Sequence, residues 1–105
     1  MEIKEIMSFI KKESERLKQK YGYDDKEKRI LARAVKLSEE MGEFSNEILS
    51  HISMQREDKE QTNKDKLSEE FADVIITAFL LADILGINFQ EAIKNKINKI
   101  EKRYK

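Results

Sequence analysis

Hydrophobic residues recur every three or four positions along most of this chain, which is the spacing of one face of an α-helix. Four segments show the pattern, at about residues 3–20, 26–53, 65–85 and 89–104. Gly22 and Gly86 are suited to end the first and third segments, and Asn88 is suited to cap the fourth, three residues before Glu91. The chain has no proline that would interrupt these helices. The pattern therefore predicts an all-α fold.

Each predicted helix carries an apolar stripe that needs a partner. The side chains expected to face inward are Ile3, Ile6, Met7, Ile10 and Leu17 in the first helix, Ile30, Ala34, Leu37, Met41, Phe44, Ile48 and Ile52 in the second, Leu67, Phe71, Val74, Ala78, Leu81 and Leu85 in the third, and Phe89, Ile93, Ile97, Ile100 and Tyr104 in the fourth. Short or medium connections favour antiparallel neighbours. We therefore expect residues 1–105 to form one domain, a four-helix bundle, with a polar, mobile loop at about 55–65.

The composition limits the classes of function. Hydrophobic residues make up 39% of the chain and charged residues 40%, so a single copy has a modest core and we expect an oligomer. The 21 basic and 21 acidic residues cancel, which argues against binding a nucleic-acid polymer. The longest apolar stretch, residues 74–86, is too short for a membrane span and contains Asp83. The N-terminus lacks the apolar segment of a signal peptide, so a cytoplasmic protein is expected.

One acidic motif occurs twice, as LSEEMGEF at residues 37–44 and as LSEEFADV at residues 67–74. Because each helical residue turns by about 100°, each copy places its acids on one strip that borders the apolar stripe. The strips are Lys36, Glu40, Glu43 and Glu47 on the second predicted helix and Lys66, Glu70, Asp73 and Thr77 on the third. The acids of the two strips would converge if these helices pack together.

Converging carboxylates repel one another and raise one another's pKa values, and a bound cation would relieve that repulsion. Oxygen ligands without sulfur suit a hard ion, Mg²⁺ or alternatively Mn²⁺. A di-iron bundle would need Glu-x-x-His on two helices, whereas the single histidine, His51, does not fit that pattern and is expected at the surface. The alternative is that both motifs are ordinary charged helix faces, since a bundle also needs repeated amphipathic patterns.

The stretches KLSEEMGEF and EEFADVI resemble the MazG-like nucleoside triphosphate pyrophosphohydrolases, whose pattern is Glu-Glu-x-x-Glu followed by Glu-x-x-Asp. The resemblance implies an all-α homodimer or homotetramer that hydrolyses a nucleotide between its α and β phosphates, giving a monophosphate and pyrophosphate. It implies a catalytic role for Glu39, which would orient or deprotonate the attacking water, and for Glu40. The implied Mg²⁺ ligands are Glu40, Glu43, Glu70 and Asp73.

Phosphates also need cations. Lys96, Lys99 and Arg103 share a strip of the last predicted helix, and the family often carries Lys, Asn and Arg at this spacing. Lys96 and Arg103 fit as substrate-binding residues, but Ile100 stands where the family has Asn. The alternative is a solvated basic face that complements the helix dipole.

Other residues could also contact a nucleotide. Lys36 is a further substrate-binding candidate, together with Arg33. Tyr21 and Tyr23 are expected in a loop, free to face a ligand, whereas Phe44 and Phe89 are assigned to the core. The rival to an enzyme is a non-catalytic helical module whose acidic face binds a basic partner.

Overall fold

The computed structural model describes residues 1–22, 25–52 and 64–105. It contains four helices, α1 (Ile3–Tyr21), α2 (Lys26–Ile52), α3 (Lys64–Ile84) and α4 (Phe89–Lys102). No strand occurs among the described residues, which confirms the all-α prediction. None of the described helices is both long and apolar enough to cross a lipid bilayer. Tyr23 and most of the predicted loop at 55–65 lie outside the described residues.

Local signals at the helix ends act as the sequence predicts. The αL conformation of Gly22, with φ of 65°, lets its N–H donate to the Lys18 carbonyl at 2.9 Å and ends α1. Gly86, with φ of 74°, follows the end of α3. The Asn88 side chain accepts a hydrogen bond from the Glu91 N–H at 3.0 Å and caps α4. These caps make the end of α1 and the start of α4 properties of the local sequence.

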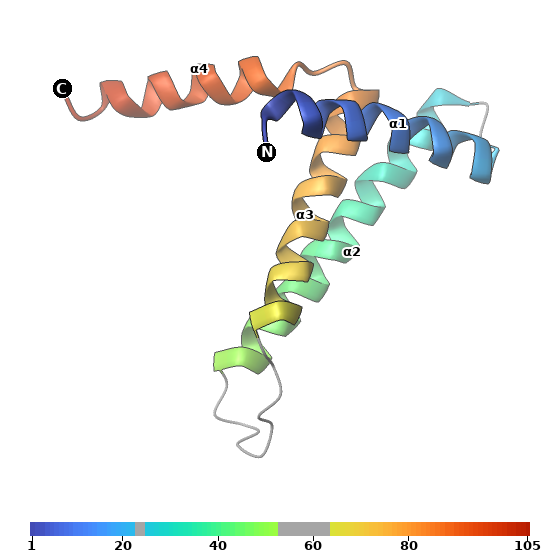
Figure 1. The fold of residues 1–105 in the computed structure, drawn as a ribbon, viewed down its shortest axis with the longest axis horizontal. Coiled ribbons are helices and arrows are strands. Elements are labelled where there is room, and N and C mark those ends of the chain that lie inside the picture. The colour runs from blue at the N-terminus through green and yellow to red at the C-terminus, as the bar shows by residue number, and fades with distance from the viewer. Residues whose placement is uncertain (23–24, 53–63) are drawn as a thin grey trace.

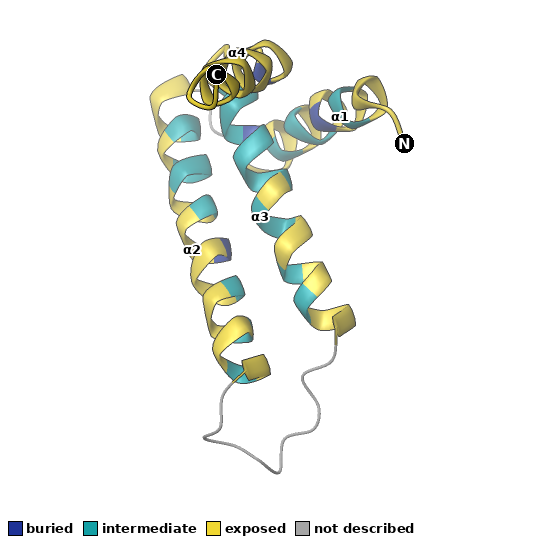
Figure 2. Ribbon diagram, turned by 90° about the vertical axis from the view of Figure 1, so that its left-hand side faces the viewer, coloured by how far each residue is buried: buried dark blue, intermediate teal, exposed yellow. Residues whose placement is uncertain are grey.

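Helices α2 and α3 lie side by side and run antiparallel, as Figures 1 and 2 show. Helix α1 crosses them at the end where α2 begins and α3 ends (Figure 1). There Lys11 Nζ pairs with Asp83 Oδ1 at 2.6 Å, which ties α1 to the last turn of α3. The three helices therefore form one packed unit whose other end is made by α2 and α3 alone.

The core lies where α1, α3 and the start of α4 meet. Its buried apolar side chains are Ile10, Leu80 and Phe89. The ring of Phe89 stacks on that of Phe79, with centroids 4.1 Å apart and planes 9° apart. The core assignment of Phe89 is confirmed, and this stack fastens the first residue of α4 to α3.

Beyond that stack α4 points away from the α2–α3 pair (Figure 1). The prediction that its stripe faces inward is wrong for Ile93, Ile97, Ile100 and Tyr104, which are exposed in the single chain. The reason is that α4 meets the other helices only near its start. The resulting radius of gyration is 16.9 Å, against about 13 Å for a compact domain of this length.

Part of the predicted apolar face of the other helices is also open. Six residues expected to face inward are exposed: Ile3, Met41, Ile48, Ile52, Phe71 and Leu85. Phe44 is half-buried and contacts Phe71, with ring centroids 5.9 Å apart. Since α1 covers only one end of the α2–α3 pair, none of the described helices covers the far half of that pair (Figure 2).

Candidate functional site

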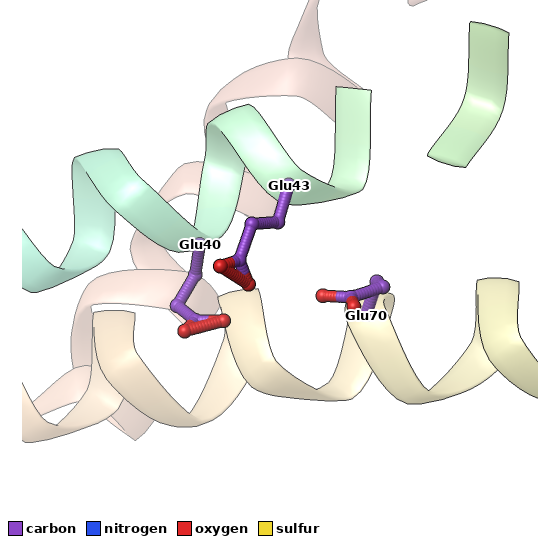
Figure 3. A group of neighbouring side chains, drawn as sticks. All are labelled: Glu40, Glu43 and Glu70. Atoms are coloured by element: carbon purple, nitrogen blue, oxygen red, sulfur yellow. The ribbon is translucent and has the colours of Figure 1, made fainter. Parts of the chain in front are cut away.

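Three carboxylates from two helices meet between α2 and α3. Glu40 and Glu43 lie one turn apart on α2, and Glu70 lies on α3 (Figure 3). One carboxylate oxygen of each lies within 4.8 Å of those of the other two. The two copies of the acidic motif are thus brought together by the antiparallel packing of their helices.

Glu40 is the buried charged side chain of this cluster. Only 7% of the residue is exposed, and it is the one buried charged residue among those described. Its Oε2 pairs with Lys36 Nζ at 3.6 Å, but its Oε1 has no hydrogen-bond partner within the described part of the chain. A buried charge without a full set of partners destabilises a fold, and this oxygen could accept a cation as its partner.

Glu70 repeats this arrangement on α3. Its Oε1 pairs with Lys66 Nζ at 3.6 Å, while Oε2 is buried and lacks a partner among the described residues. The repeated sequence KLSEE explains the symmetry, because it places a lysine one turn before each of these glutamates. Each glutamate therefore has one oxygen paired with lysine and one unpartnered oxygen.

The electrostatics of the cluster disfavour its negative charge. Burial raises the pKa of Glu40 above its ordinary value, and the charges of Glu43 and Asp73 raise it further, while Lys36 partly offsets them. Asp73 is therefore close enough to Glu40 to interact with it, although it is not one of the three residues whose oxygens converge. A cation between these carboxylates would stabilise their ionised forms.

The donor set fits a hard divalent cation. All three converging groups are carboxylates, and two of them hold an unpartnered buried oxygen. Mg²⁺ and Mn²⁺ prefer such oxygen ligands. His51 is exposed at the end of α2, as expected, and so adds no nitrogen ligand to the cluster.

Glu39 and Lys36 lie beside the cluster rather than within it. The Glu39 side chain is 59% exposed, and its Oε1 lies 3.4 Å from Lys36 Nζ. This hydrogen bond, together with Glu40, raises the pKa of Lys36 against the opposing effect of burial. Lys36 thus links the exposed acid to the buried one.

The predicted phosphate-binding residues of α4 are not near the acids in the single chain. Lys96 and Arg103 are both exposed, and the helix that carries them points away from α2 and α3 (Figure 1). Within one chain they form a solvated basic face.

A cavity of about 360 Å³ adjoins the carboxylates, between α1, α2 and α3. The apolar part of its wall is made by Leu17, Ala32, Ile76 and Leu80. Glu40 of the acidic cluster lines it too, as do Asp73 and the cations Arg33 and Lys36. Its volume lies within the range of about 300–1,000 Å³ typical of small-molecule sites.

Helix α1 contributes residues to this cavity that the acidic motifs do not reveal. Tyr21 lines it as the last residue of α1, not as the loop residue that was predicted. Glu13 lines it as well and was not among the predicted site residues. The sequence holds a signal for Glu13, because this acid falls within the apolar stripe, between Ile10 and Leu17.

A family of known proteins shares the segment that carries the acidic motifs. The family model described as the MazG-like family matches residues 31–105. The match contains both acidic motifs and α4, and it leaves out α1. No curated protein and no solved structure matches the chain significantly.

Proposed function

Because the chain belongs to the MazG-like family, we propose that it is a metal-dependent nucleotide pyrophosphohydrolase. The observation that carries this proposal is the pair of buried, unpartnered carboxylate oxygens on Glu40 and Glu70, next to Glu43. A helix face that served only for solubility would hold its acids in water. Here two helices instead hold acids at a cost in stability, which is typical of functional sites.

Glu40, Glu43 and Glu70 would hold Mg²⁺ or Mn²⁺, and Asp73 is the proposed fourth ligand. Such an ion, when bound, offsets phosphate charge, polarises the α-phosphoryl group and makes a water molecule a stronger nucleophile. The cavity beside Glu40 and Asp73 would receive the rest of the nucleotide. The metal site and the substrate site would therefore share these two acids.

In the proposed reaction a water oxygen bonds to the α phosphorus, and the bond from that phosphorus to the α–β bridging oxygen breaks. The products are a nucleoside monophosphate and pyrophosphate. Glu39 is the proposed proton acceptor for the attacking water, since its carboxylate is exposed and adjoins Glu40 in sequence. Lys36, which lines the cavity and pairs with Glu40, would offset phosphate charge. No side-chain nucleophile takes part.

A panel of nucleoside triphosphates incubated with the protein and Mg²⁺ tests the proposal. We expect pyrophosphate and a monophosphate, with turnover abolished by EDTA and restored by added Mg²⁺ or Mn²⁺. Release of orthophosphate and a diphosphate would contradict the mechanism. The absence of any turnover across the panel would favour the rival, a helical module that binds a basic partner through its acids.

A further inference from the structure

We propose that Glu13 selects nucleobases that carry an exocyclic amino group. The inference rests on the proposed function for the position of the phosphates, and on the cavity for the position of the base. It concerns a residue of α1, which lies outside the segment that the family model matches.

The cavity has two chemically different ends. Glu40 and Asp73 line the end next to the acidic cluster. Arg33 is seven residues before Glu40 on α2, which places it about 10 Å further along the helix axis. Leu80 is seven residues after Asp73 on α3. Because α3 runs antiparallel to α2, Leu80 lies toward the same end of the cavity as Arg33. A nucleotide with its α phosphate at the acids would therefore place its base between Ala32 and Leu80.

Helix α1 lines that second end. It crosses the pair where α2 begins and α3 ends (Figure 1), and it is tied there by the pair between Lys11 and Asp83. Its cavity-lining residues are Glu13, Leu17 and Tyr21. Glu13 is thus the acid that a base would meet at the end of the cavity remote from the acidic cluster.

Glu13 is held in place and has a spare acceptor. Its side chain is 29% exposed, and its Oε1 accepts from Arg16 Nε at 2.8 Å and from Arg16 Nη2 at 2.7 Å. Its Oε2 has no partner among the described residues. A carboxylate only accepts hydrogen bonds when ionised. Its free oxygen therefore favours an N–H group on the base and repels a carbonyl oxygen.

Thr77 adds a second acceptor to the same cavity. Its hydroxyl donates to the carbonyl oxygens of Asp73, at 2.8 Å, and Val74, at 3.1 Å. With its proton directed at the backbone of its own helix, the oxygen can offer only lone pairs to a ligand. Cytosine presents an amino group where uracil presents a carbonyl oxygen, and guanine carries an amino group that hypoxanthine lacks. The cavity therefore favours the amino-bearing member of each pair.

The experiment compares kcat/KM for dCTP against dUTP and for dGTP against dITP, with Mg²⁺, in wild type and in Glu13→Gln. For at least one pair we expect wild type to prefer the amino-bearing base by about tenfold or more, because a hydrogen bond to a charged group is lost in the other. The Glu13→Gln amide keeps the shape but adds a donor, so the ratio should fall to about one. The change should appear in KM, since the amino group is remote from the reacting atoms.

Glu15→Gln is the matched control, because Glu15 lies on the same helix, bonds to Gln19 and does not line the cavity. It should leave both ratios unchanged. Calorimetric binding of dCMP and dUMP gives a second readout that needs no turnover. If wild type hydrolyses nothing, the proposed function fails, while the monophosphates still decide the role of Glu13. If neither the kinetic ratios nor the binding ratio depends on Glu13, the inference is overturned and the proposed function stands.

Discussion

At the scale of single residues, Glu40 belongs to the candidate site, and its buried charge lowers the stability of the metal-free fold at neutral pH. Burial raises the pKa of this carboxyl in the folded protein, so the folded state binds its proton more tightly than the unfolded chain does. The stability that this preference provides is complete below the ordinary pKa of 4.5 and is lost as the pH rises through the raised value. Metal-free protein should therefore be less stable at neutral pH than an otherwise equal protein without this charge.

Glu40→Gln removes that charge at every pH and keeps the shape. Without metal, its free energy of unfolding should equal that of wild type below about pH 4.5 and exceed it by a growing margin toward neutral pH. Denaturant titrations in EDTA at several pH values measure the difference. Glu39→Gln is the control, since this neighbour is exposed and should change stability by less than about 1 kcal/mol. A Glu40→Gln protein that is less stable at neutral pH would show that Lys36 already compensates the buried charge.

Asp73→Asn tests the fourth proposed ligand. Mg²⁺ at a hundred times its Kd should stabilise wild type by about 2.7 kcal/mol, because it binds only the native state. The variant should lose turnover and most of this stabilisation, while its metal-free form melts at the same temperature as wild type or higher. Thermal melts with EDTA and with millimolar Mg²⁺ compare the two. If Mg²⁺ does not change the melting temperature of wild type, and Asp73→Asn is active, the metal site is ruled out.

At the scale of the helices, one aromatic stack determines how α4 joins the molecule. Phe89→Ala removes the buried ring that stacks on Phe79. Truncating a core Phe typically costs about 3–5 kcal/mol, so the melting temperature should fall and the amides of α4 should exchange faster with solvent. Gln90→Ala, at the next and exposed position, is the control and should do neither. Unchanged exchange in α4 would mean that other contacts, such as those with a second copy, hold this helix.

At the scale of the whole molecule, the exposed apolar surface favours association with another chain. The chain has 8299 Å² of accessible surface, against about 6,100 Å² for a compact monomer of this mass. The surplus is as large as the surface that a stable protein interface buries, about 1,200–2,000 Å². The exposed apolar side chains include the stripe of α4, where Ile97 is 52% exposed. We therefore propose that copies of this chain associate as a homodimer or homotetramer through these faces.

Light scattering at micromolar concentration measures the mass. Wild type should give two or four chains, and Ile97→Glu should lower the mass by placing a charge in the stripe. Asn95→Glu adds the same charge on the opposite face of α4, and it should leave the mass unchanged. A wild-type mass of one chain would contradict this prediction.

The helices and the candidate ligands could be predicted from the linear sequence. Helix formation depends on neighbours three and four residues apart, and the ends depend on local groups such as Gly22 and Asn88, so a linear pattern suffices. The same periodicity placed Glu40, Glu43, Glu70 and Asp73 on strips beside the apolar stripes. It could not show whether those strips meet, because helix packing joins residues far apart in the chain.

Three features depend on how the helices pack: which acids converge, which of their oxygens lack partners, and where α4 points. The convergence of Glu40, Glu43 and Glu70 needs α2 and α3 to be antiparallel at one register. The hydrophobic pattern could not predict that Ile97 is exposed, since periodicity identifies an apolar face but not what covers it. Glu13 reaches the cavity because α1 crosses the pair, so residues as far apart in the chain as Glu13 and Thr77 line the same cavity. Burial, and with it the raised pKa of Glu40, is a property of these distant contacts and not of the local sequence.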